Sequence, residues 1–141
     1  MRTLGYSPPL APTGLASPNA SGGSRAKNYR LTGMNVNQAT TDLGSFTGLP
    51  ASYLVRRLTA LNGSISLTTA TVDLRTAAGG AGVAIASAAA LSAITAAGLT
   101  ADLALAVTNG IQSVASLVLR NVTPQGAAAT CDFILEIEDL T

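Results

Sequence analysis

From Leu31 onward, the sequence is divided into short apolar runs of four to eight residues that recur at intervals near ten. Gly, Asn, Pro and Thr separate these runs. Runs of this length, separated by turn-forming residues, are typical of strands in two antiparallel sheets packed face to face. The sequence therefore predicts an all-β protein, an antiparallel β-sandwich of seven or eight strands.

The individual runs predict where these strands lie. Strands are expected over residues 31–37, 53–63, 69–77, 82–88, 101–107, 116–123 and 129–140. The clearest is 69–77, where Val72 and Leu74 alternate with Asp73 and Arg75, a pattern that predicts one buried and one wet face. Many positions in the other runs hold Ala, Gly, Ser or Thr, and aromatic residues make up only 4% of the chain. A thin core is expected.

Two segments do not follow the strand pattern. Residues 44–52 are rich in Gly and Ser and are expected to form a linker. The Ala-rich residues 87–98 fit either a helix or a strand, because alanine favours helices and Gly98 suits a helix C-terminus. The uncharged stretch 76–101 is long enough to cross a bilayer, but Ala, Gly, Ser and Thr dominate it, so no membrane partner is expected.

Residues 1–30 differ in composition and are predicted to be an extended arm before a sandwich domain of residues 31–141. Residues 1–28 contain four of the six prolines, three basic residues and no acid. Such a segment has too little apolar surface to fold alone, so we expect another surface to hold it. The contact residues expected on this arm are Arg2, Leu4, Tyr6, Pro8, Pro9, Leu10, Arg25, Lys27 and Arg30.

Charge is balanced overall but segregated along the chain. Eight basic and seven acidic residues give a net charge of +1, which argues against a nucleic-acid partner. Six basic residues lie in the first 57 positions, whereas four acids lie in the last ten. These ends are either ordinary solvated surface or complementary surfaces of two copies. On the last predicted strand, Ile134 shares the wet face with Glu136 and Glu138, so these three residues are also candidate contacts.

The residues needed for most catalytic and metal sites are missing. The chain has no histidine, which is the commonest general base and the commonest nitrogen ligand for metals. Its single cysteine, Cys131, therefore has no imidazole to activate it as a nucleophile. The Gly-rich residues 79–84 lack the Lys-Ser/Thr of a phosphate-binding loop and are interpreted as a turn. We therefore expect no enzyme activity and no cofactor.

Three stretches together resemble proteins encoded among the structural genes of tailed bacteriophages: YLVRRLTALNGSISLTTATVDLRTAAGGAG, AALSAIT and VTPQGAAATCDFILEIEDL. With the Pro/Gly-rich arm, the layout is similar to that of capsid cement (decoration) proteins of Bordetella-type short-tailed phages. The resemblance covers most of residues 31–141. It implies a jelly-roll sandwich that is made in the bacterial host cytoplasm and sits on the outside of the phage head as a homodimer, tying major capsid protein subunits together without a cofactor.

Two other functions remain open at this point. The first is a receptor- or carbohydrate-binding sandwich of a phage tail fibre, for which Tyr6, Tyr29 and Tyr53 are the aromatic candidates. The second is a head-completion or tail component, which is present in far fewer copies per particle than a cement protein.

Overall fold

The structure is a computed structural model that describes residues 25–106 and 110–141. Nine strands and a short 3-10 helix make up this part of the chain. They are β1 (Ala26–Asn35), β2 (Thr41–Thr47), β3 (Tyr53–Leu61), β4 (Thr71–Arg75), η2 (Ala78–Gly80), β5 (Ala84–Ala90), β6 (Ala101–Leu103), β7 (Ile111–Gln112), β8 (Ser116–Thr123) and β9 (Thr130–Asp139).

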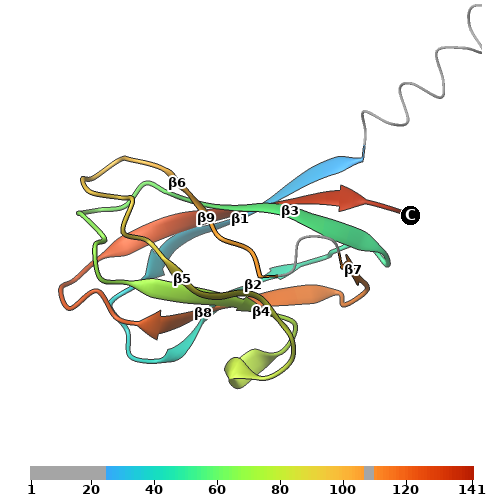
Figure 1. The fold of residues 1–141 in the computed structure, drawn as a ribbon, viewed down its shortest axis with the longest axis horizontal. Helices are drawn as coiled ribbons and strands as arrows, with labels where there is room; N and C mark the ends of the chain where they lie inside the picture. The colour runs from blue at the N-terminus through green and yellow to red at the C-terminus, as the bar shows by residue number, and fades with distance from the viewer. Residues whose placement is uncertain (1–24, 107–109) are drawn as a thin grey trace, which may run out of the picture.

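The strands form two antiparallel sheets that pack face to face (Figure 1). The first sheet has the order β1-β9-β3-β6, with the short β7 also pairing with β3, and the second has the order β2-β8-β4-β5. Apart from β7 and the β4–β5 hairpin, successive strands alternate between the sheets. This is the winding of a jelly roll, in which eight strands form two Greek keys. The predicted all-β, jelly-roll-like sandwich is therefore confirmed.

The core lies between the sheets and is filled mainly by aliphatic side chains. Phe46 and Phe133, the two phenylalanines of the chain, are buried there together with Tyr53. Alanine occupies six further core positions: Ala60, Ala70, Ala86, Ala89, Ala101 and Ala129. Because alanine buries little apolar area, these positions contribute less hydrophobic stabilisation than leucine or phenylalanine would.

The first two strands, β1 and β2, do not have the boundaries that the sequence predicted. Ala26–Asn35 begins inside the segment predicted as the arm, and its residues 26–31 pair with β9. Residues 44–47, expected to be a linker, belong to β2, so that expectation is wrong. The physical reason is Phe46, which is only 2% exposed and anchors the short strand in the core.

The Ala-rich segment is a strand followed by loop, not a helix. β5 ends at Ala90, and residues 91–100 form turns between β5 and β6. The predicted wet face of β4 is also wrong for Asp73, which is only 6% exposed because β5 and Arg75 cover it. Within the described ranges, we find no helix with both the length and the apolar character needed to span a bilayer.

Candidate functional site

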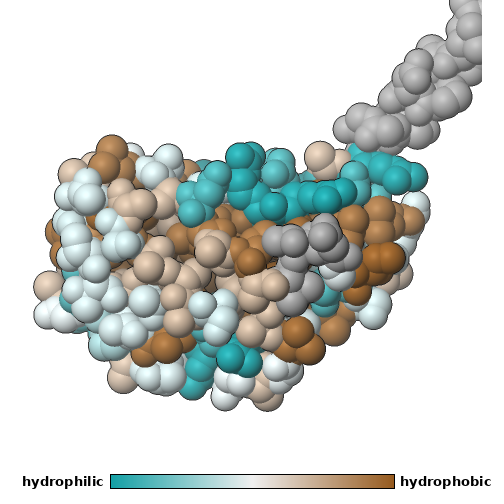
Figure 2. All heavy atoms as spheres, in the orientation of Figure 1, coloured by the Kyte–Doolittle hydropathy of each residue, from teal (hydrophilic) through white to brown (hydrophobic). Residues whose placement is uncertain are grey.

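Charged side chains of both signs gather on the outer face of the first sheet, and we call this surface the paired-charge face. Figure 2, drawn in the orientation of Figure 1, shows hydrophilic residues along the side formed by β1, β9 and β3. The strand register places Asn28 of β1 and Arg57 of β3 on either side of Glu136 of β9. In the neighbouring row, Ile134 lies between Arg30 and Thr59.

The basic front of the chain and its acidic tail pair with each other within one molecule. Lys27 lies 2.7 Å from Asp139, and Arg56 lies 2.5 Å from Glu138. These pairs form because β1 and β3 flank β9 on either side, which brings residues about a hundred positions apart into register. The pKa of Asp139 is lowered to about 2 by its hydrogen bond from Lys27 and by those from the hydroxyl and the backbone N–H of Thr141.

Asp132, on this face, contacts three donors. Its carboxylate accepts hydrogen bonds from Arg30 Nη2 at 2.7 Å, from Asn62 Nδ2 at 2.9 Å and from the backbone N–H of Gly33 at 2.7 Å. Gly33 has φ +66° and lies where the β1–β9 register shifts between Leu31 and Met34. The donors from Asn62, Arg30 and Gly33 lower the pKa of Asp132 to about 2. Asp132 therefore fastens the irregular part of β1 to β9.

Arg57 is held more loosely than the other arginines of the face. Its Nε lies 3.4 Å from Glu136 Oε1, and its Nη1 lies 3.7 Å from Asp102 Oδ2. Charge-assisted hydrogen bonds are normally about 2.7–2.9 Å long. Arg57 therefore lies between two carboxylates without closing tightly on either. Asp102 Oδ1 also accepts a hydrogen bond of 2.8 Å from the Thr59 hydroxyl.

A depression of about 500 Å³ opens around Arg57 on this face. Residues of β1, β3, β6 and β9 line it. Its lining includes Asn28, Arg57, Thr59, Asp102, Ile134 and Glu136. Because these residues stand on paired strands rather than on long loops, the backbone fixes their relative positions.

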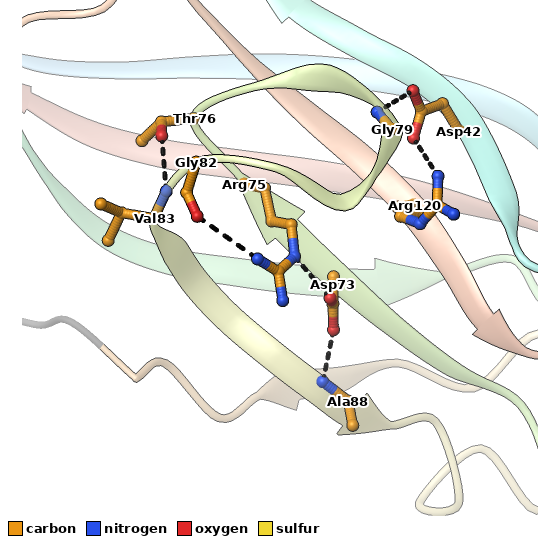
Figure 3. A network of polar contacts seen from close by, with 9 residues as sticks. All are labelled: Asp42, Asp73, Arg75, Thr76, Gly79, Gly82, Val83, Ala88 and Arg120. Atoms are coloured by element: carbon orange, nitrogen blue, oxygen red, sulfur yellow. Dashed lines mark hydrogen bonds and ion pairs between the residues drawn. The ribbon is translucent and has the colours of Figure 1, made fainter.

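The outer face of the second sheet carries a different charged network, which holds the β4–β5 hairpin (Figure 3). Asp42 of β2 accepts hydrogen bonds from Gly79 N at 2.8 Å and from Arg120 Nη1 at 2.9 Å. The Gly79 N–H is the main cause of the lowered pKa of Asp42, and Arg120 lowers it further. The hairpin loop is thereby tied to β2 and β8.

Asp73 makes a similar attachment within this hairpin, between β4 and β5. It accepts hydrogen bonds from Arg75 Nε at 2.7 Å and from Ala88 N at 2.6 Å (Figure 3). Ala88 has φ +46°, a left-handed conformation that is uncommon for a residue with a side chain. Asp73 thus stabilises an irregularity in the edge strand β5. Alternation alone did not predict this role, because it placed Asp73 in solvent.

The structure brings four of the predicted contact residues onto the paired-charge face: Arg30, Ile134, Glu136 and Glu138. Lys27 lies at its border, paired with Asp139, and the Arg25 carbonyl accepts a hydrogen bond of 2.8 Å from Asp139 N. The other predicted contacts lie outside the described residues; they are Arg2, Leu4, Tyr6, Pro8, Pro9 and Leu10. The prediction missed Arg57 and Asp102 as members of a site, since nothing in the sequence specifies that β6 pairs with β3.

Two of the three tyrosines suggested for stacking on a sugar are used internally. Tyr53 is fully buried, its hydroxyl donates to the Val114 carbonyl, and burial raises its pKa to about 12. Tyr29 packs against the core, and its hydroxyl donates to the Gly48 carbonyl at 3.3 Å. Tyr6 lies outside the described residues. Of the two described tyrosines, Tyr53 is closed to a ligand and Tyr29 is only partly exposed.

Cys131, Asp132 and Asp139 are poorly suited to catalysis near neutral pH. Burial raises the pKa of the Cys131 thiol to about 11, and its Sγ donates to the Leu61 carbonyl at 3.3 Å. A general base works best when its pKa lies near the working pH, whereas the pKa values of Asp132 and Asp139 are both about 2. In the described part of the chain, no three His, Cys, Asp or Glu side chains are grouped as metal ligands.

Comparisons of the chain with protein-family models, with curated proteins and with solved structures found no match. A jelly-roll winding is shared by proteins of many functions, so the fold alone does not assign one.

Proposed function

We propose that this chain is a non-enzymatic structural protein that decorates the outside of an icosahedral phage head. It bridges neighbouring major capsid protein subunits, as a homodimer, and thereby stabilises the shell. The proposal rests on the sequence resemblance to phage cement proteins and on the way the predicted arm joins the sandwich.

The observation that carries the proposal is the position of β1. Residues 26–30, predicted to belong to the arm, pair with β9 and stand at the end of the order β1-β9-β3-β6. On its other side, β1 pairs with no strand among the residues that the structure describes. An edge strand presents unpaired N–H and C=O groups to which another chain can add a strand. The arm is thus rooted at a sheet edge suited to protein contacts.

The ion pairs between β1 and β9 suit this role mechanically. Lys27–Asp139 and Arg30–Asp132 join the first strand of the sandwich to its last strand. Force applied to residues 1–24 by a neighbouring subunit would load β1 along its ladder with β9. The backbone hydrogen bonds and side-chain pairs of this ladder would share a load applied along β1, which makes the ladder resistant to shear.

Removal of residues 2–24 tests the proposal with β1 left intact. Full-length and truncated protein are mixed with phage heads lacking their decoration, and the bound protein and the temperature of head rupture are measured. We expect the full-length protein to bind and raise the rupture temperature, and the truncated protein to bind more weakly. Circular dichroism and thermal melting of the free proteins control for folding.

The two parts of the proposal fail differently. If the full-length protein does not bind heads of its own phage, the capsid role is rejected. If the truncated and full-length proteins bind and stabilise heads equally, the capsid role stands but the arm has no part in it.

A further inference from the structure

The geometry points to a ligand site at the depression around Arg57, and we propose that it binds a neutral saccharide through its hydroxyl groups. This binding is separate from the attachment of the protein to a phage head. It uses side chains of the paired-charge face, whereas attachment uses the arm and the backbone edge of β1.

The first reason is that the charged groups of the depression have hydrogen-bonding capacity that their internal contacts do not use well. Arg57 lies 3.4 and 3.7 Å from its two acidic neighbours, whereas Arg30 and Arg56 lie within 2.7 Å of theirs. The Arg57 side chain is 53% exposed and the Asp102 side chain is 60% exposed. A ligand can therefore reach both the guanidinium and a carboxylate without breaking a short ion pair.

The second reason is the arrangement of charge, which disfavours a charged ligand. A cation entering between Glu136 and Asp102 would meet the Arg57 guanidinium between them. An anion drawn to Arg57 would meet both carboxylates at close range, where like charges repel. A neutral ligand avoids both penalties.

The third reason is the mixture of donors and acceptors. Arg57 and the Asn28 amide donate, the carboxylates accept, and the Thr100 hydroxyl can do both. The Thr59 hydroxyl already donates to Asp102 Oδ1, so it can accept from a ligand. A sugar hydroxyl also donates and accepts, so one hydroxyl can donate to a carboxylate while accepting from the guanidinium. Two adjacent hydroxyls of a sugar ring can form hydrogen bonds with a carboxylate and the guanidinium at the same time.

Size and shape agree with this assignment. A volume of about 500 Å³ lies within the range of small-molecule sites and is open enough for part of a longer glycan. Ile134, the branched apolar residue of the lining, provides a surface for the C–H face of a sugar ring. This gives Ile134 a role on an otherwise polar face.

A glycan array with matched arginine variants tests the proposal. The probes are immobilised glycans ending in glucose, galactose or mannose, with sialylated glycans and a lysine-rich peptide as charged probes. The test variant is Arg57→Gln, and the control is Arg56→Gln, which changes the neighbouring residue whose partner Glu138 lies outside the depression. Thermal melting confirms that both variants are folded.

We expect the unaltered protein to bind at least one class of neutral glycan. Arg57→Gln should weaken that binding at least tenfold, and Arg56→Gln should leave it within about twofold, since the loss of one hydrogen bond to a charged group lowers affinity by roughly tenfold or more. The proposal is overturned if no neutral glycan binds, if the charged probes bind more tightly, or if the two variants bind alike.

Discussion

Asp132 offers the sharpest test of how the long edge strand β1 is held. Replacing Asp132 with Asn keeps the shape of the side chain but leaves one acceptor oxygen where there were two, and turns an NH₂ group toward donors. The carboxylate now accepts from Arg30, Asn62 and the N–H of Gly33 at 2.7–2.9 Å. We expect Asp132→Asn to lower the free energy of unfolding by about 1.5 kcal/mol.

The lowered pKa of Asp132 gives the scale of the part of this effect that depends on its charge. A fall from 3.8 in the unfolded chain to about 2 in the folded protein corresponds to at most about 2.5 kcal/mol. Solvent reduces it, because the partner Arg30 side chain is 46% exposed. Because the folded pKa is the lower one, this stabilisation is complete above about pH 4 and is lost as the pH falls toward 2.

Urea denaturation at a series of pH values measures this contribution directly. The difference in unfolding free energy between the unaltered protein and Asp132→Asn should be largest near pH 6 and shrink as the pH falls to 2. Asp102→Asn, at a side chain that is 60% exposed, is the control and should change stability by less than about 0.5 kcal/mol. A difference that is small at pH 6, or that does not shrink in acid, would refute the fastening role of Asp132.

Two further predictions concern the β4–β5 hairpin and the buried thiol. Gly82→Ala should lower the free energy of unfolding by at least about 2 kcal/mol more than Gly48→Ala does. Both glycines have φ +72°, so the backbone strain of the substitution is similar. Only at Gly82 would the new Cβ overlap Thr76 Oγ1 and lie 2.9 Å from Ala77 N. Equal melting temperatures for the two variants would contradict this. Cys131 should react with an aromatic disulfide reagent at pH 8 at least a hundredfold more slowly in the folded protein than in denaturant, since its pKa is raised from 9.0 to about 11. Equal rates would show that the thiol is accessible.

The sequence predicted some strands closely and others poorly. The alternating run 101–107 was expected to be one strand, but among its described residues only Ala101–Leu103 form one, β6. The run 116–123 became β8 with the expected limits, and 129–140 became β9 with small changes at its ends. β2 was missed because its Gly and Ser resemble a linker, and only the burial of Phe46 marks it as a strand. That burial depends on the opposite sheet, which local sequence does not describe.

The site was predicted in part for a related reason. Composition identified a basic front and an acidic tail, and alternation correctly put Ile134 and Glu136 on one face. Whether these charges meet within one molecule depends on β1 and β3 both pairing with β9, a long-range arrangement that no local pattern specifies. The loose position of Arg57 between two acids follows from that same arrangement.

The hydrogen bond from Asp139 N to the Arg25 carbonyl has a practical consequence for engineering. The backbone enters the sandwich and leaves it at one corner, as the course of β1 and β9 in Figure 1 also shows. A short peptide joining Asp139 to Arg25 would create a circularly permuted chain with new ends elsewhere. Conversely, cargo fused after Thr141 would stand beside the point where residues 1–24 join the sandwich, so a display fusion would be better placed at a loop on the opposite end.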